Sequence, residues 1–478
     1  MNIINPAPFF HKVLIQHRIG AGLTHAKKII MILTHAASNG VLKRCWIKFL
    51  TVIFVLVLSL ILRLHNYEQY PQRGATSDEY TYAFLGMSLL KDHIPISWSS
   101  FPVYENRRHL TIKKLYFPIV WPYFDHPPLS GFLTGGLSLL VGHDSFEKVD
   151  LKTIRLVPIF LSMLSSILVF LIAFRLYSYK TAAWALLIYA TTTIFVINGR
   201  IALSENLLTP LFLLSLYLFS LFEKKISYIK AIMFGILSGL AFWTKELGIV
   251  IFLALFYLFK KNNLKLKPFV IFTAVSFLII VSYFLYGAYY DWVLFIKIWS
   301  FQSGREIGPQ TLHMLLNNPI IVNKPYMDGW YFFGFLSIFY SLLDLKKNKL
   351  IVVPSLLYFL LLIFFLTRHG EMGWYVIPLF PFMAIASAWI LVESIENRNW
   401  HIFSLLLFVG MAQIKFLYED IFGLTPGQFR IILVLLLGPL LVASLFNREK
   451  LFKILSNAWF YIFIIGNVIL TYNYIHPA

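Results

Sequence analysis

Long apolar runs separated by short polar turns dominate the chain. Most of these runs approach the about 20 residues that an α-helix needs to cross the ~30 Å hydrocarbon core of a bilayer. We expect transmembrane helices at 46–64, 154–175, 181–198, 205–222, 228–243, 247–259, 268–290, 330–344, 350–366, 373–393, 401–417, 429–446 and 453–473. The short run 247–259 is alternatively a tight re-entrant pair with the run before it. The pattern predicts an all-α polytopic membrane protein with about 13 transmembrane helices.

The composition excludes a soluble multidomain protein. Of the 478 residues, 59% are hydrophobic and only 13% are charged, and the mean hydropathy is +0.73. A soluble domain carries about 25% charged residues. The single cysteine, Cys45, excludes a disulfide framework.

The distribution of charge predicts the orientation of the chain. The net charge is +19, but many basic residues lie in short turns between apolar runs, such as EKK, KKNNLKLK, DLKKNK and NREK. Short basic turns stay in the cytoplasm, and most acidic residues then fall on the opposite side. We therefore expect a multi-pass protein of the cell membrane, with a cytoplasmic N-terminus, chemistry on the extracytoplasmic face and no nucleic-acid partner.

Three regions follow from this topology. Residues 1–45 form a basic cytoplasmic segment, which is either a loosely ordered tail on anionic headgroups or an interfacial amphipathic helix. Residues 46–395 form the membrane module, whose first outer loop spans 65–153, and residues 396–478 form variable C-terminal helices. In the loop we expect two membrane-parallel helices, at 76–90 and 127–141, the second beginning at two prolines that suit a first helical turn.

The carboxylates of Asp78 and Glu79 open the first of these helices. A carboxylate held at a helix N-terminus stays ionised and can act as the general base toward an acceptor hydroxyl. The alternative interpretation is structural, with Thr76 and Glu79 forming a capping box.

Other candidates lie at the same predicted face. Asp125 and His126 precede the second loop helix, where Asp125 could cap it and His126 could be a ligand, an acid or a structural hydrogen-bonding group. Arg200 and Glu205 flank an outer turn, in which a guanidinium can hold a phosphate and Glu205 suits a helix start.

Two further outer turns carry cations. Lys245 lies beside Glu246, so the two side chains could form an ion pair, or Lys245 could snorkel to the membrane boundary. Arg368, near His369, Glu371, Trp374 and Tyr375, suits a phosphate and a sugar ring; alternatively the segment is an interfacial belt.

A metal or nucleotide site has little support in the sequence. Asp-x-Asp, HExxH, GxGxxG and Walker motifs are absent. We expect no cofactor and disfavour, without excluding, a divalent metal.

Five motifs in order resemble a known family. They are Asp78-Glu79 after the first run, DHPPLSGFL, GRIALSE, GLAFWTK, and Arg368 followed by Tyr375, Pro378 and Pro381. The chain resembles the protein O-mannosyltransferase and aminoarabinose-transferase-like branch of the glycosyltransferase C superfamily, over roughly 46–395. The sequence lacks the Trp-Trp-Asp motif of oligosaccharyltransferases and an inserted domain of the eukaryotic type, and we expect no soluble C-terminal domain.

The resemblance implies an integral-membrane glycosyltransferase. Members move a sugar from a polyprenyl-phosphate donor, at the extracytoplasmic face, to a lipid, glycan or protein acceptor. By this resemblance Asp78 is the catalytic carboxylate with Glu79 beside it, and Arg200, Lys245 and Arg368 meet the lipid phosphate. Tyr375, Asp125, His126 and Glu205 are further substrate-site candidates.

Two other classes remain open at this stage. A secondary transporter or lipid flippase has a similar number of helices, but it would place charges near the bilayer midplane in two related halves, and the sequence shows no such repeat. A non-catalytic assembly factor is the third interpretation.

Overall fold

The computed structural model describes residues 41–112, 115–262, 265–304, 312, 315–316, 319–365, 373–397, 399, 401, 403–405 and 423–477. The chain divides into two compact units, Met1–Phe54 and Val55–Ala478. The predicted basic segment 1–45 lies almost wholly outside the described residues, and so does most of the predicted span 401–417.

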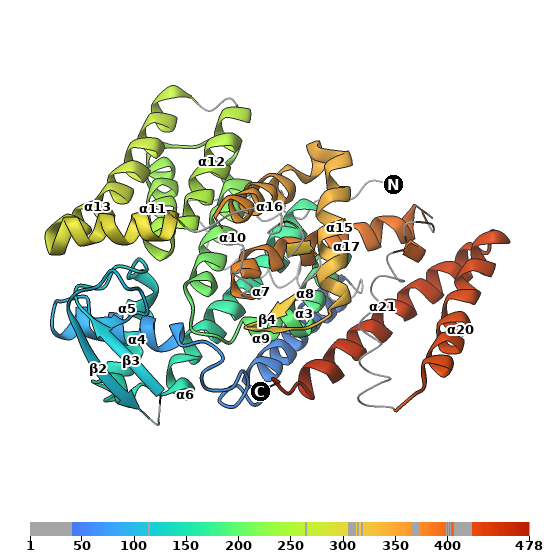
Figure 1. The fold of residues 1–478 in the computed structure, drawn as a ribbon. Helices are drawn as coiled ribbons and strands as arrows, with labels where there is room; N and C mark the ends of the chain where they lie inside the picture. Colours follow the sequence, from blue (N-terminus) through green and yellow to red (C-terminus); the bar gives the residue numbers. More distant parts are fainter. Residues whose placement is uncertain are drawn as a thin grey trace, which may run out of the picture. The chain divides into compact units, whose positions relative to one another are not determined.

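Helices make up 76% of the structure, which confirms the predicted fold class (Figure 1). The α-helices are α3 (Val41–Leu64), α4 (Asp78–Lys91), α5 (Leu129–Leu140), α6 (Leu151–Ile154), α7 (Leu156–Leu176), α8 (Tyr179–Thr191), α9 (Thr193–Asn198), α10 (Ser204–Phe222), α11 (Tyr228–Thr244), α12 (Ile249–Lys261), α13 (Leu266–Ser303), α15 (Gly329–Tyr340), α16 (Leu345–Phe365), α17 (Phe380–Glu396), α20 (Pro426–Leu445) and α21 (Glu449–Tyr472). The 3₁₀ turns are η1 (Phe146–Lys148), η2 (Glu246–Gly248), η3 (Ser341–Asp344) and η4 (Gly373–Leu379).

Within the described residues, eight helices or continuous helical runs are long and apolar enough to cross a membrane. Shorter apolar helices, α5 and α11, come in addition, and α8 and α12 lie where the sequence predicts further spans. The protein is therefore a multi-pass membrane protein, while the count of 13 stays a prediction. Large apolar side chains such as Val270, Phe277, Leu278 and Leu285 of α13 are exposed, as lipid contact requires.

The connection between the predicted spans 268–290 and 330–344 begins as a helix. The backbone leaves the helical conformation at Asp291, as expected at the end of a span, but α13 then continues to Ser303. The carboxylate of Asp291 accepts the N–H of Leu294 at 2.9 Å and so caps the new segment. Hydrophobic periodicity placed the end of the span correctly and missed the helix beyond it.

The first loop contains both predicted helices, α4 and α5, and also a small sheet that the sequence did not predict. The strands β1 (Ser97–Trp98), β3 (Leu115–Val120) and β2 (Arg107–Ile112) lie in that order and are antiparallel. Alternation over six-residue strands is a weak signal beside long apolar runs, so the sheet went unnoticed.

Glycines bring α4 and α5 into backbone contact. A Cβ on Gly86 would lie 1.8 Å from the carbonyl oxygen of Gly131, and one on Gly135 would lie 2.4 Å from the backbone nitrogen of Met87. No larger residue fits at these positions without separating the helices. This close crossing fixes α4, and with it the carboxylates at its start.

Candidate active site

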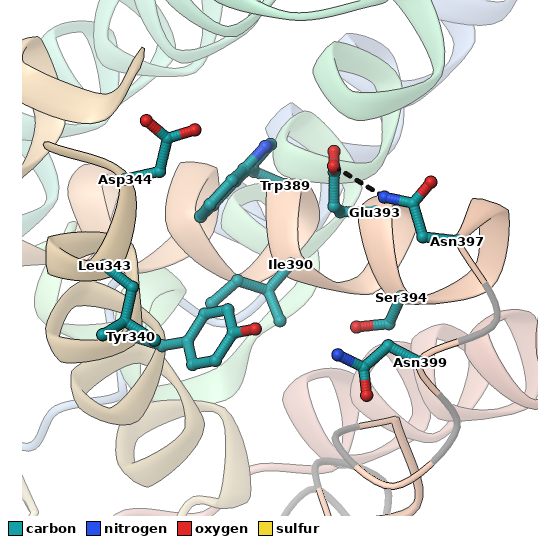
Figure 2. A pocket seen from close by; sticks show the side chains of 9 residues that line it. All are labelled: Tyr340, Leu343, Asp344, Trp389, Ile390, Glu393, Ser394, Asn397 and Asn399. Carbon is teal, nitrogen blue, oxygen red and sulfur yellow. Dashed lines mark hydrogen bonds between the residues drawn. The ribbon is translucent and has the colours of Figure 1, made fainter. Parts of the chain in front are cut away.

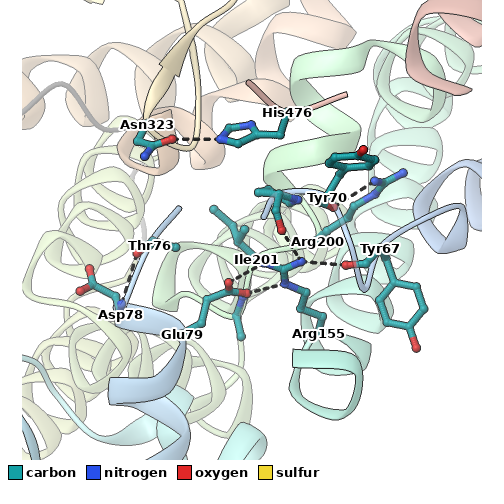
Figure 3. Close-up of polar contacts among 12 residues, drawn as sticks. Tyr67, Tyr70, Thr76, Asp78, Glu79, Arg155, Arg200, Ile201, Asn323 and His476 are labelled. Carbon is teal, nitrogen blue, oxygen red and sulfur yellow. Dashed lines mark hydrogen bonds and ion pairs between the residues drawn. The ribbon is translucent and has the colours of Figure 1, made fainter. Parts of the chain in front are cut away.

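Helix α4 presents its two carboxylates to different surroundings. Asp78 is the first residue of α4 and is partly exposed, and its N–H donates to the hydroxyl of Thr76 at 3.2 Å (Figure 3). The pKa of Tyr82 is raised well above its usual value. Burial is the largest cause, and the negative charges of Glu205 and Asp78 come next. The α4 N-terminus stabilises the ionised form of a carboxylate at this position.

Glu79 points into the protein and forms an ion pair with Arg155. Its Oε1 and Oε2 accept from Nε and Nη2 of Arg155 at 2.9 and 2.7 Å (Figure 3). Oε1 also accepts the N–H of Ala202 at 2.9 Å. Arg155 in turn donates to the carbonyls of Tyr67 and Pro71. The capping box expected between Thr76 and Glu79 therefore does not form, because Glu79 joins three distant segments instead.

Arg200 lies in the same interior region, away from Asp78. Its guanidinium is 2% exposed and donates to the backbone carbonyls of Leu62 and Tyr70 (Figure 3). Its Nε has no hydrogen-bond partner in the described part of the chain. Burial, followed by the nearby charges of Arg63 and Arg155, lowers the pKa of Arg200 to about 9. Arg200 thus has other partners than the second predicted phosphate contact, Lys245, which pairs with Glu205.

Lys245 pairs with Glu205 and not with its sequence neighbour Glu246. The ammonium group forms an ion pair with the Glu205 carboxylate and lies 4.3 Å from the centre of the Tyr375 ring. Burial lowers the pKa of Lys245, but Glu205 and Tyr375 outweigh burial, so the pKa rises above its usual value. Lys245 is therefore a permanent cation, shared between a carboxylate and an aromatic face.

The local backbone explains how these residues meet. Lys245 follows the last residue of α11, and its extended conformation turns the chain into η2. Glu205 is in the first turn of α10. Tyr375 lies in η4, which is held close to α9 because Asn198 bonds both Ile320 and Val322, and Gly373 bonds Val322.

A polar chain connects this cluster to the first loop. The Ser204 hydroxyl donates to Glu205 at 3.1 Å and lies 2.9 Å from the Tyr82 hydroxyl. The Tyr82 ring stacks on His126 at 5.2 Å. Since Tyr82 lies one helical turn after Asp78, both share a face of α4. Four predicted residues, His126, Glu205, Lys245 and Tyr375, thus lie along one connected set, which adjoins the α4 face of Asp78.

Sequence reasoning missed Tyr82, Ser204 and Arg155. Tyr82 could have been found from its spacing to Asp78, and Ser204 from its place beside Glu205. Arg155 carries no such signal, because it is a single arginine before an apolar helix.

Asp125, the neighbour of His126 in the sequence, has a structural role. It is 6% exposed and accepts from the hydroxyls of Ser99 at 2.5 Å and Tyr104 at 2.7 Å. These bonds tie the turn before α5 to the strand β1. Asp125 therefore orients the loop rather than capping α5, whose N-cap residue is Pro128.

Arg368, His369 and Glu371 lie outside the described residues. Among the residues that are described, no group of three or more histidine, cysteine, aspartate or glutamate side chains could hold a metal ion. Independence from metal stays a prediction.

A pocket of about 240 Å³ lies elsewhere, between α15, η3 and α17 (Figure 2). It is lined by Asp344, Trp389, Glu393 and Asn397 among others, and Glu393 accepts from Asn397 at 2.8 Å. None of the predicted site residues lines it, so it is not part of this candidate site.

The helical membrane core and the long, partly helical first loop define a multi-pass membrane protein, and the comparisons with known proteins support the resemblance inferred from the sequence. More specifically, residues 125–286 match the family described as dolichyl-phosphate-mannose-protein mannosyltransferase. This range contains three of the five motifs, DHPPLSGFL, GRIALSE and GLAFWTK.

The chain is similar to two solved structures. ArnT from Cupriavidus metallidurans bound to undecaprenyl phosphate superposes with a TM-score of 0.51 at 12% identity, covering 89% of this chain and 77% of ArnT. The Archaeoglobus fulgidus oligosaccharyltransferase in the apo form gives 0.49 at 14% identity, covering 88% of this chain and 56% of the other. The chain thus spans little more than half the length of the archaeal protein. No curated protein matches the sequence.

Proposed function

We propose that this protein is an integral-membrane glycosyltransferase that takes its sugar from a polyprenyl-phosphate donor and works at the extracytoplasmic face. One observation carries the proposal: Lys245, a buried cation held by Glu205 and Tyr375, belongs to a polar cluster that adjoins the α4 face of Asp78. A cation and a carboxylate in this relation suit a leaving phosphate and an attacking hydroxyl. The family match over 125–286 and the undecaprenyl phosphate bound to ArnT support the choice of donor.

The reaction follows from the charges. An oxygen or nitrogen of the acceptor attacks the anomeric carbon of the donor sugar, and the bond between that carbon and the phosphate oxygen breaks. Asp78 takes the acceptor proton, and the electron pair of the broken bond leaves on the polyprenyl phosphate. Lys245, together with Arg368, stabilises the added negative charge.

We assign roles to the other residues from their contacts. Tyr82 and Ser204 keep Glu205 in place, and Glu205 and Tyr375 hold the Lys245 ammonium. His126 stacks on Tyr82 at the Asp78 side. Glu79 has its carboxylate occupied by Arg155 and Ala202, so we assign it the positioning of α4 and leave proton transfer to Asp78.

The test is transfer of a radiolabelled sugar from synthetic polyprenyl-phosphate donors in membranes that contain the protein. In parallel, flux of the same lipid-linked sugar is measured in liposomes. Transfer that depends on Asp78 and Lys245 supports the proposal. Flux without transfer would instead identify a transporter or flippase.

A further inference from the structure

A second, larger pocket lies in the first loop, on another side of α4 from Asp78. Its volume is about 430 Å³, within the ~300–1,000 Å³ typical of small-ligand sites. Its lining includes Ser77, Tyr80, Trp98, Phe117, Phe146 and Glu147. None of the residues of the Glu205–Lys245 cluster lines it, so the two are separate.

The aromatic wall of this pocket is held rigidly. The Trp98 indole donates to the carbonyl of Ser77 at 3.2 Å, which fixes its plane relative to the start of α4. The rings of Trp98 and Phe117 meet edge to face at 5.8 Å, and those of Phe117 and Phe146 at 5.1 Å. Strand β3 supplies Phe117 and η1 supplies Phe146. The ring faces are therefore positioned before any ligand arrives.

Polar groups stand at the edges of these rings. The Tyr80 hydroxyl is buried and has no hydrogen-bond partner among the described residues. Ser77 occupies the N-cap position of α4, but its side chain makes no capping hydrogen bond. Glu147 is exposed at the rim. A buried hydroxyl without a partner is unfavourable in the empty site and is satisfied when a ligand supplies one.

We propose that this pocket binds a sugar ring of a glycan acceptor. A pyranose ring has apolar C–H faces that cover aromatic rings, and hydroxyl groups around its edge that meet polar side chains. An acyl chain would leave the Tyr80 hydroxyl unpaired. The lining carries two cations, Arg73 and Lys148, and two carboxylates, Glu147 and Asp150, so their formal charges cancel and do not favour an anionic group. Rings and edge hydroxyls together fit a neutral sugar best.

The position of the pocket relates it to the transfer reaction. Ser77 and Tyr80 share one face of the first turn of α4, while Asp78 and Tyr82 share another. A glycan held by one sugar in the pocket can extend around the N-terminus of α4 and present the next hydroxyl to Asp78. This step rests on the proposed function, whereas binding in the pocket does not.

Binding is tested without donor. The full chain, purified in detergent and labelled at its single cysteine, Cys45, is applied to an array of printed mono- to hexasaccharides, and the best oligosaccharide is titrated in solution. Trp98→Ala should raise its Kd by about tenfold or more, which corresponds to ~1.4 kcal/mol. Tyr80→Phe, which keeps the ring, should raise Kd by about threefold to tenfold. Glu105→Gln, an exposed change in the same loop, should leave Kd unchanged.

The outcomes separate this inference from the proposed function. The inference is overturned if no printed glycan binds, if Tyr80→Phe and Trp98→Ala bind as wild type does, or if a peptide library binds the pocket in place of glycans. Tyr80→Phe should melt as wild type does, so that its Kd reports the pocket rather than folding. Glycan binding by a wild-type chain that shows no transferase activity of any kind would contradict only the proposed function.

Discussion

The ammonium group of Lys245 lies 4.3 Å from the centre of the Tyr375 ring while it pairs with the Glu205 carboxylate. The ring and the carboxylate occupy two sides of the cation and fix its position. In the proposed mechanism, the N–H groups that Glu205 does not engage would meet the donor phosphate and stabilise its developing negative charge.

The first prediction separates the chemical role of Lys245 from its structural role. Lys245→Met leaves Glu205 buried without its partner, and losing one member of a buried pair costs about 3–5 kcal/mol of folding free energy. Changing Glu205→Gln as well should restore most of the melting temperature. Turnover should be about two orders of magnitude below that of the wild type in both variants.

Lys349→Met is the matched control, because its ion pair with Glu223 is partly exposed, and such pairs contribute only about 0–1 kcal/mol. If the double variant recovered turnover together with stability, Lys245 would have a structural role only.

The second prediction concerns Asp78. Asp78→Asn removes the base but keeps the size of the side chain, so transfer should fall by about 10²–10⁴-fold with unchanged membrane insertion. Asp144→Asn, an exposed carboxylate of the same loop, should retain activity. Normal turnover in Asp78→Asn would place the base elsewhere.

The third prediction concerns Arg368, which precedes Gly373-Trp374-Tyr375 in the sequence. Charge grows on the phosphate only as the sugar leaves, so losing this guanidinium should lower kcat more than it raises KM. We expect Arg368→Ala to lose about two orders of magnitude, in line with the ~2.7–4 kcal/mol of a lost transition-state donor. Arg368→Lys should recover only part, because Lys offers a point charge and not two parallel donors.

Arg430→Ala is the control, since Arg430 is an exposed arginine at the start of a helix predicted on the same side. If kcat is normal in both Arg368 variants and only expression or melting temperature changes, the residue is an interfacial anchor.

Chelation should not stop the reaction. The described residues bring no three metal-ligating side chains together, and cations are available for the phosphate. Transfer is measured before and after EDTA. Complete loss that one divalent ion restores would require a metal site, and Glu79, Glu205 and His126 would be its first candidates.

The topology can be tested with an impermeant maleimide in intact cells. In a Cys45→Ser background, Glu105→Cys should be labelled from outside, because it lies in the first loop, whereas Lys346→Cys should not. Both positions are exposed, so access depends on the side of the membrane. Labelling of Lys346→Cys alone would invert the orientation.

The sequence predicted the membrane class, the positions of most spans and both helices of the first loop. These features depend on local composition and hydrophobic periodicity, both of which can be read from the sequence. The structure brings four of the predicted site residues, His126, Glu205, Lys245 and Tyr375, into one connected set, and their roles stay predictions.

Only the tertiary structure decided which charges face each other. The adjacent carboxylates have different surroundings: Glu79 is buried against Arg155, whereas Asp78 lies at the start of α4. Lys245 pairs with Glu205 and not with its sequence neighbour Glu246. The physical reason is that a buried charge needs a partner at hydrogen-bond distance. That partner is supplied by whichever helix packs alongside, and the packing depends on close contacts such as Gly86 on Gly131. Local sequence patterns do not predict these contacts.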